Sequence, residues 1–154
     1  MDDIIFRKAA IQDIPALIEL RILQLLEEGA EPVIDLHNPL LDYYERHMAD
    51  GSFISWVAEI YGKIIAVSGM SFTEKPPYYT NPTGKIGLLS SMYTLKAFRR
   101  KGLSKKLLHA VMNEANAYGC GSVYITASNM GAQLYENCGF KRNGNFFQFN
   151  FEKR

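Results

Sequence analysis

A short cationic turn stands between an apolar segment and a helical pattern, and this combination of residue types favours anion binding. Three consecutive cations, Arg99, Arg100 and Lys101, come directly before Gly102. The first N–H groups of a helix have no partner within it, and glycine lets a ligand approach the backbone closely. The chemistry that these residues suggest is capture of a phosphate or diphosphate at this helix N-terminus, although a basic turn before a helix is more often a solvated surface. The residues that give the following helix its apolar face are Leu103, Leu107, Val111 and Ala115.

This turn resembles the signature of a known enzyme family. Arg99 to Ser104 reads R-R-K-G-L-S, which is similar to the Q/R-x-x-G-x-G/A signature of the GNAT superfamily of acyl-CoA-dependent N-acetyltransferases. The last signature position holds Ser104 in place of Gly or Ala, and serine is small enough to leave the backbone accessible. The resemblance implies that acetyl-CoA is the co-substrate and that its diphosphate lies on this turn. The residues implied to hold it are Arg99, Arg100, Lys101, Gly102, Leu103, Ser104 and Lys105.

The resemblance also assigns a role to the segment before the turn. In the GNAT fold, the strand before the signature diverges from the strand that follows the signature helix. The pantetheine arm of acyl-CoA lies in the gap and pairs with exposed backbone. By position, these backbone groups belong to Met92, Tyr93 and Thr94. A backbone N–H near Met92 or Tyr93 is also implied to stabilise the negative oxygen that forms when the thioester is attacked.

A second segment, from Ala127 to Phe140, is similar to a later GNAT motif, A-S-x-x-G-x-x-L-Y-E-x-x-G-F. The resemblance places Tyr135 near the acyl sulfur as the general acid, because a phenol can donate a proton to the departing thiolate. The segment taken alone favours a tyrosine that simply packs on a short amphipathic helix, and the catalytic role follows from the two motifs together. A further cofactor contact falls on Ser128, which we favour, or on Asn129, one position out of register.

The group that accepts the proton of the attacking amine is not identified by the sequence. Many members of the superfamily carry a glutamate on the central strand, where this chain has no carboxylate between Leu88 and Ser91. The candidates are a water held by Ser90 or Ser91, and the side chains of Glu27, Glu28 and His37.

The acceptor is expected to be an amine of a small molecule or peptide. Aromatic residues that cluster would suit a small amphipathic or cationic amine through cation–π contact. Glu27 and Glu28 would add attraction for a positive charge. The aromatic residues considered for this pocket are Tyr43, Tyr44, Trp56, Tyr78 and Tyr79.

Composition limits the remaining function classes. Of 154 residues, 47% are hydrophobic and 21% are charged, and we expect one domain over residues 1–154. The net charge of +1 gives no general attraction to nucleic acid, and no apolar run approaches the ~20 residues of a membrane span. Cys120 and Cys138 are too few for a metal site or disulfide framework, so we expect no metal. The start of the chain shows no secretory signal, and we expect a cytoplasmic protein.

The elements that must position these residues follow from the apolar periodicity. We expect strands at Ile4–Arg7, Phe53–Ile60, Ile64–Thr73, Leu88–Thr94, Ser122–Ala127 and Phe146–Phe151. We expect helices from Ile14, with Asp13 as N-cap, over Leu40–Ala49, from Leu103 to about Gly119, and over Met130–Asn137. The order β-α-α-β-β-β-α-β-α-β describes an α/β domain with a mixed sheet flanked by helices, similar to the GNAT fold from Ile4 to Phe151.

Three readings of the function follow. The first is an N-acetyltransferase in which the amine attacks acetyl-CoA directly in a ternary complex, since neither cysteine lies in the signature. The second is a non-catalytic acyl-CoA-binding sensor, which the missing strand carboxylate favours and Tyr135 opposes. The third is a nucleic-acid-binding domain that uses the cations of Arg99 to Lys106, which the shortness of the run and the lack of interleaved aromatics oppose. The Phe-rich segment Phe146–Phe151 suits either a dimer edge or core packing, and a homodimer is therefore a further expectation.

Overall fold

The computed structural model describes residues 3–126 and 129–152. The strands in this part of the chain are β1 (Ile4–Lys8), β2 (Phe53–Ile54), β3 (Trp56–Ile60), β4 (Lys63–Glu74), β5 (Lys85–Thr94) and β6 (Ser122–Ile125). The α-helices are α1 (Ile14–Glu27), α2 (His37–Asp50), α3 (Leu103–Tyr118) and α4 (Asn129–Asn137), with 3-10 turns at Ile11–Asp13 and Lys96–Phe98. None of the helices in the described ranges is both long and apolar enough to cross a bilayer.

The strands form a single mixed sheet in the order β1-β3-β4-β5-β6, with the short β2 paired to β4. All pairs are antiparallel except β5 with β6. The parallel pair covers only Ile86–Leu89 of β5 and Ser122–Ile125 of β6. Among the described residues, the second half of β5 therefore has no strand on its β6 side. This arrangement confirms the predicted α/β class and mixed sheet.

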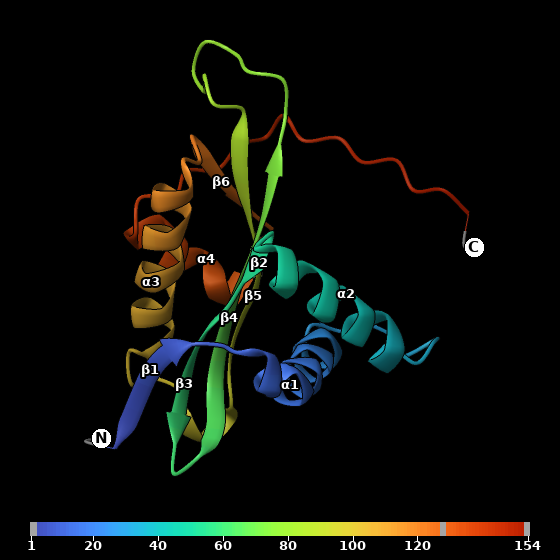
Figure 1. The fold of residues 1–154 in the computed structure, drawn as a ribbon, viewed down its shortest axis with the longest axis vertical. Coiled ribbons are helices and arrows are strands. Elements are labelled where there is room, and N and C mark those ends of the chain that lie inside the picture. The colour runs from blue at the N-terminus through green and yellow to red at the C-terminus, as the bar shows by residue number, and fades with distance from the viewer. Residues whose placement is uncertain (1–2, 127–128, 153–154) are drawn as a thin grey trace.

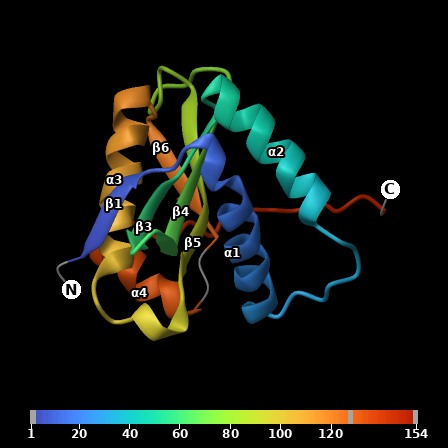
Figure 2. The same cartoon turned by 60° about the horizontal axis from the view of Figure 1, so that its bottom comes forward.

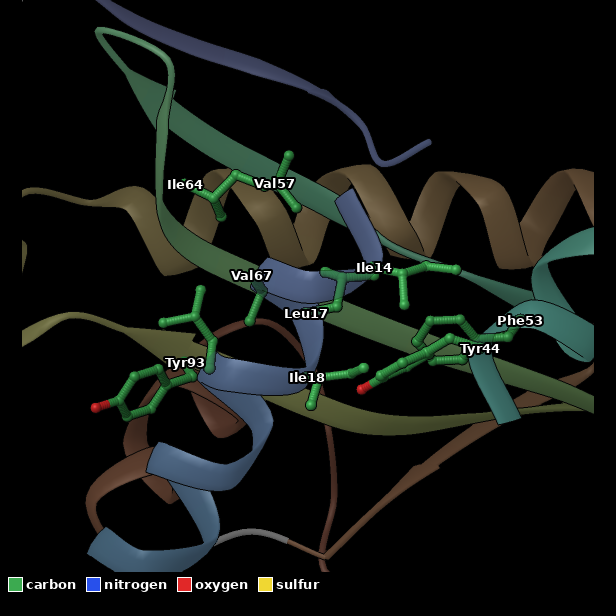
Figure 3. Packing of buried hydrophobic residues seen from close by; sticks show 10 residues of the cluster. Ile14, Leu17, Ile18, Tyr44, Phe53, Val57, Ile64, Val67 and Tyr93 are labelled. Atoms are coloured by element: carbon green, nitrogen blue, oxygen red, sulfur yellow. The ribbon is translucent and has the colours of Figure 1, made fainter. Parts of the chain in front are cut away.

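Helices cover both faces of the sheet (Figure 1). Figure 2 shows α1 and α2 on one face and α3 on the other, with α4 near the lower end of α3. Side chains of α1 and α2 pack on the sheet in one cluster, part of which Figure 3 shows. Burying each large apolar side chain stabilises the fold by roughly 1.5–3 kcal/mol. The residues buried in this cluster include Ile14, Leu17, Ile18, Tyr44, Phe53, Val57, Val67 and Tyr93.

Helix α3 follows its sequence pattern closely. It begins after Gly102 and ends at Gly119, and both glycines have left-handed backbone angles, with φ of 78° and 97°. All four residues of the predicted apolar face, Leu103, Leu107, Val111 and Ala115, are buried. This apolar face packs against β3, β4 and β5. The packing fixes the N-terminus of α3 beside the second half of β5, which has no β6 partner among the described residues.

The structure corrects one predicted helix start and refines another. Helix α2 begins at His37 and not at Leu40, because Pro39 falls in the first turn, where its missing N–H costs nothing. Asp13 is the N-cap residue of α1, as predicted, but its side chain makes no capping hydrogen bond to the helix. Its carboxylate instead accepts hydrogen bonds from Arg7 at 2.7 and 2.9 Å and from the N–H of Ala10 at 2.7 Å.

The predicted closing strand is wrong as well. Phe146–Phe151 has no strand partner among the described residues and belongs to no regular element. Its four phenylalanines are 77–93% exposed. Alternation of residue types predicts an extended backbone, but a strand also needs a neighbour with free N–H and C=O groups.

Candidate active site

A cleft opens where β5 and β6 separate. Their pairing stops at Leu89 and Ile125, and beyond this point lies a cavity of about 640 Å³. That volume lies in the range of small-molecule and cofactor sites. The cleft is lined by the ends of α1, β5 and β6, the start of α3, and α4. Its lining includes Gln24, Glu27, Glu28, Ser90, Ser91, Met92, Tyr93, Thr94, Arg99, Arg100, Gly102, Leu103, Ser104, Lys105, Ile125, Thr126 and Tyr135.

Backbone groups of β5 face this cleft in an alternating pattern. The N–H of Leu95 donates to Ile65 O at 2.9 Å, so the backbone of Leu95 points toward β4. Because backbone direction alternates along a strand, the N–H and C=O of Met92 and Thr94 point away from β4, and those of Tyr93 point toward it. The C=O of Thr94 accepts the Nε–H of Arg99 at 2.8 Å. The N–H groups of Met92 and Thr94 and the C=O of Met92 are thus the backbone groups available to an extended ligand.

The strand bends at the start of this segment. The register of β4 with β5 shifts between Gly69 and Met70, which leaves Ser90 as an extra residue in β5. Such a bulge disturbs the ladder locally and increases the twist of the strand. The guanidinium of Arg21, from α1, donates to Ser90 O at 2.7 Å. The bulge at Ser90 directly follows Leu89, the last residue of β5 that pairs with β6, so it lies at the mouth of the cleft.

The N-terminus of α3 forms one end of the cleft. Gly102 has a φ of +78°, and a Cβ placed on it would meet no atom within 4 Å. Within the described ranges, no acceptor is found for the N–H groups of Gly102, Leu103, Ser104 and Lys105. Free N–H groups and the helix dipole together attract an anion.

Cations surround the same end. Arg99 is held in place: its Nη2 contacts Glu27 Oε2 at 2.8 Å, and its guanidinium lies 5.4 Å from the centre of the Tyr93 ring. Arg99 also holds the pKa of the Glu27 carboxyl below its usual range. Arg100 and Lys105 line the cleft, and neither forms an ion pair with any residue that the structure describes. Their charge is therefore available to a ligand.

Tyr135 lies on α4, where its ring packs in the core and the residue also lines the cleft. It is 7% exposed and packs edge-on against Phe140, with ring centres 5.7 Å apart. Burial, together with the negative charge of Glu28, raises the pKa of Tyr135 to about 12. The phenol is therefore protonated at neutral pH, and no described residue accepts its proton in a hydrogen bond. It can act as a donor to a ligand atom in the cleft.

The end of α1 supplies the acidic side of the cleft. Both Glu27 and Glu28 line the cleft, but the Glu27 carboxylate forms an ion pair with Arg99. Glu28 forms no ion pair in the described part of the chain, and its carboxylate accepts a hydrogen bond from Gln24 Nε2 at 3.5 Å. The influence of Glu28 on the pKa of Tyr135 places these two groups within electrostatic reach of each other. A neutral donor and a carboxylate thus face one space.

The structure brings together most of the residues singled out from the sequence. Lys101 is an exception, because it lies in the turn but does not line the cleft. Ser128 lies outside the described residues, and Asn129 begins α4. Of the proposed bases, His37 starts α2 and does not line the cleft, whereas the two glutamates and the two serines do.

The expectation of one aromatic acceptor pocket is wrong. None of the five residues considered for it lines the cleft. Tyr44 is buried between α2 and the sheet. Trp56 packs against the two apolar clusters that α3 forms with the sheet. The hydroxyl of Tyr43 shares a hydrogen bond of 2.7 Å with Ser71 Oγ. Tyr78 and Tyr79 lie in the exposed loop between β4 and β5. Composition revealed these aromatics but not the faces on which they lie.

The sequence analysis missed Gln24, which lines the cleft, and Arg21, which supports it from α1. Gln24 is a buried polar side chain on the apolar face of α1, and Arg21 hydrogen-bonds to it at 3.3 Å and to Ser90 O. A buried polar residue on an apolar face was the signal that could have identified Gln24. The described residues contain no group of three or more His, Cys, Asp and Glu placed to hold a metal.

Comparisons with known proteins match this geometry. The family model of the acetyltransferase (GNAT) family matches residues 17–140. A crystal structure of a predicted acetyltransferase with acetyl-CoA from Clostridium acetobutylicum is 33% identical, with a TM-score of 0.92, and 96% of each chain is covered. The uncharacterized N-acetyltransferase YjgM of Escherichia coli strain K12 is 28% identical over 142 residues, which is 89% of this chain and 81% of the relative. A GCN5-related N-acetyltransferase from Ralstonia eutropha JMP134 shares the fold at 24% identity, with a TM-score of 0.87 over 96% of this chain and 98% of that one.

Proposed function

This chain belongs to the acetyltransferase (GNAT) family, and we propose on that basis that it transfers an acetyl group from acetyl-CoA to a primary amine of a small molecule or peptide. The observation that supports the proposal most is the meeting of three kinds of group in one cleft. Unpaired N–H groups with free cations lie at the start of α3, unpaired backbone lies along β5, and a protonated phenol faces a carboxylate. An acyl-CoA offers a matching diphosphate, an extended amide chain and a thioester.

The cofactor half of the cleft fits the diphosphate and the pantetheine arm. The N–H groups of Gly102 to Lys105 would bind the diphosphate, and Arg100 and Lys105 would neutralise its charge. The backbone of Met92 and Thr94 would pair with the pantetheine amides as an added strand does. The N–H of Met92 is the better candidate for binding the carbonyl oxygen of the thioester, because the N–H of Tyr93 points toward β4. Ser128 stays a proposed contact on the evidence of its motif alone.

Tyr135 is proposed as the donor to the leaving sulfur. When the amine nitrogen bonds to the acyl carbon, the carbon–sulfur bond breaks and its electron pair goes to sulfur. The Tyr135 hydroxyl donates its proton toward that sulfur and regains one from solvent. Its pKa of about 12 keeps the proton available, and the burial that raises it also disfavours a bare thiolate in the same cleft. The step thus ends in an amide and a thiol.

Glu28 is the carboxylate we propose for the amine side. An alkyl ammonium must lose a proton before its nitrogen can attack, so a base or proton carrier is required. Glu27 is paired with Arg99 and His37 lies off the cleft, which leaves Glu28 as the carboxylate that lines the cleft with Tyr135 and has no ion pair among the described residues. Its charge would attract a cationic acceptor and receive its proton. Positively charged amines are therefore the acceptor class that this cleft favours.

Release of free thiol from acetyl-CoA tests the proposal. Purified protein is incubated with acetyl-CoA and a panel of polyamines, amino sugars, amino acids and peptides with free N-termini, and thiol is followed colorimetrically. We expect acceptor-dependent release that is fastest with cationic amines. Preference for anionic acceptors would contradict the role of Glu28. Acetyl-CoA binding without release for any acceptor would instead favour a non-catalytic sensor module.

A further inference from the structure

One charged side chain of α1 contacts the strand beside the cleft without lining the cleft itself. Arg21 Nη1 donates to Ser90 O at 2.7 Å and to Gln24 Oε1 at 3.3 Å. Arg21 is half-buried, and it forms no ion pair with any residue that the structure describes. Because Arg21 is not among the residues that surround the cavity, a ligand there does not meet it. Its influence on the cleft therefore passes through Ser90 and Gln24.

Ser90 lies where the rest of the sheet constrains β5 least. As the extra residue of the bulge, it has no register partner in β4, and the pairing of β5 with β6 ends one residue earlier. Behind the bulge, the small side chains of Ser55, Ser68 and Ser91 border a void of about 10 Å³, at the lower limit for one water molecule. At a site packed this loosely, the hydrogen bond from Arg21 fixes the plane of the peptide group that joins Ser90 to Ser91.

The plane of this peptide group controls the direction of the Met92 N–H. A peptide unit is planar, so a fixed Ser90 O also fixes the N–H of Ser91. The N–H of Met92 belongs to the next peptide unit, and only the two backbone dihedrals of Ser91 separate the two units. On the other side of Met92, Tyr93 pairs with Val67 of β4. The Met92 N–H, which is the proposed donor to the thioester oxygen, is thus held between two fixed points.

The second hydrogen bond of Arg21 sets the orientation of the Gln24 amide. A guanidinium only donates, so the carbonyl oxygen of Gln24 faces it and the amide nitrogen faces the other way. That nitrogen lies 3.5 Å from Glu28 Oε2. Gln24 is 8% exposed and lines the cleft, as Glu28 does. Residues 21, 24 and 28 follow one side of α1 at spacings of three and four. Arg21 therefore also orients the carboxylate that is proposed to receive the acceptor's proton.

We propose that Arg21 is a positioning residue for acetyl transfer: through Ser90 it aims the Met92 N–H at the thioester oxygen, and through Gln24 it directs the Glu28 carboxylate. The inference rests on the proposed function, because both groups have these roles only if the cleft transfers an acetyl group. A displacement of about 1 Å in a reacting group lowers a rate by roughly 100-fold, so loss of Arg21 should appear in kcat. Other residues form the diphosphate site at the start of α3, so affinity for acetyl-CoA should be kept.

Kinetics and calorimetry together test the role. Arg21→Met should lower kcat roughly 10- to 100-fold and leave the Kd for acetyl-CoA unchanged. Arg21→Lys keeps one charged donor but not the planar fork, and it should recover part of kcat. The matched control is Arg46→Met on α2, whose guanidinium pairs with Asp42 away from the cleft, and it should keep both values. A kcat for Arg21→Met equal to that of the wild type, or a loss of acetyl-CoA affinity as large as the loss of kcat, overturns the positioning role.

Amide hydrogen exchange followed by NMR tests the same role without any reaction. Arg21→Met should make the N–H groups of Ser91 and Tyr93 exchange about ten times faster, because the bulge opens more often, and should leave those of β3 unchanged. Arg46→Met should change neither strand, and unaltered exchange in Arg21→Met would overturn the inference. If the wild type released no thiol with any acceptor, the proposed function would fail, whereas faster exchange would still show that Arg21 fixes β5. A fully active Arg21→Met protein would refute the positioning role alone.

Discussion

Replacing Gly102 by alanine is expected to weaken binding of acetyl-CoA far more than it weakens the fold. Gly102 has φ of 78° and ψ of 12°, and an added Cβ would meet no atom within 4 Å. The cost to folding is therefore that of placing an L-residue in the left-handed region, about 1–2 kcal/mol. For a chain of this size, that loss lowers Tm by roughly 2–8 °C.

The cost to binding is larger because Gly102 lines the cleft. The open space around the missing Cβ is where a diphosphate would approach the N–H groups of Gly102 to Lys105. A methyl group there would hold the ligand away and remove one or two charge-assisted hydrogen bonds, each contributing about 1.5–3 kcal/mol. Since 1.4 kcal/mol is a factor of ten, the expected rise in Kd is roughly 10- to 100-fold or more.

Gly51 provides a matched control. It ends α2 with φ of 79° and ψ of 4°, its added Cβ would also meet nothing within 4 Å, and it does not line the cleft. Gly51→Ala should lower Tm by a similar amount and leave the Kd unchanged. Titration calorimetry with acetyl-CoA measures Kd, and thermal melts followed by circular dichroism measure Tm. If Gly102→Ala bound acetyl-CoA as tightly as Gly51→Ala does, the placement of the diphosphate would be refuted.

Three further substitutions probe the rest of the account. Tyr135→Phe keeps the ring in the core and should leave the Kd for acetyl-CoA unchanged while lowering kcat roughly 10- to 1,000-fold, the scale of general acid catalysis; steady-state kinetics with unchanged kcat would rule out the donor role. Glu28→Gln should raise KM for cationic acceptors, lower kcat by a similar factor, and recover activity at higher pH as more of the amine becomes neutral. Its control is Glu19→Gln, on the exposed face of α1 and away from the cleft, and a pH–rate profile that is the same for both variants would argue against Glu28. Asp13→Asn should destabilise the fold by about 1–3 kcal/mol, because the carboxylate accepts three hydrogen bonds. Arg7 holds the pKa of Asp13 below its usual value, so its stabilisation is complete above about pH 4 and is lost as the pH falls through the lower folded value. Urea unfolding at pH 7 and pH 3 should show a smaller pH dependence for the variant than for the wild type.

The central strand-turn-helix was predictable because local rules decide it. The apolar spacing of Leu103, Leu107, Val111 and Ala115 admits one buried face, and Gly102 and Gly119 mark the ends. Neither rule requires knowledge of what packs on the helix. The free N–H groups at the start of the helix could be inferred for the same reason, because they follow from helix geometry alone.

The acceptor side was less predictable because tertiary packing decides it. Glu27 and Glu28 are adjacent in sequence and equivalent in charge, yet Glu27 pairs with Arg99, whereas Glu28 lines the cleft without an ion pair to any described residue. Which of the two is free depends on how the end of α1 meets a turn far along the chain. The closing strand was mispredicted for a related reason: alternation describes one strand, and pairing depends on its neighbour.

A crystal structure of the protein with coenzyme A tests the central claim most directly. The account predicts that the diphosphate lies within hydrogen-bond distance of the N–H groups at the start of α3, and that the sulfur lies beside the Tyr135 hydroxyl with Glu28 on the far side. Coenzyme A bound elsewhere, or bound in the cleft with its sulfur turned away from Tyr135, would contradict it.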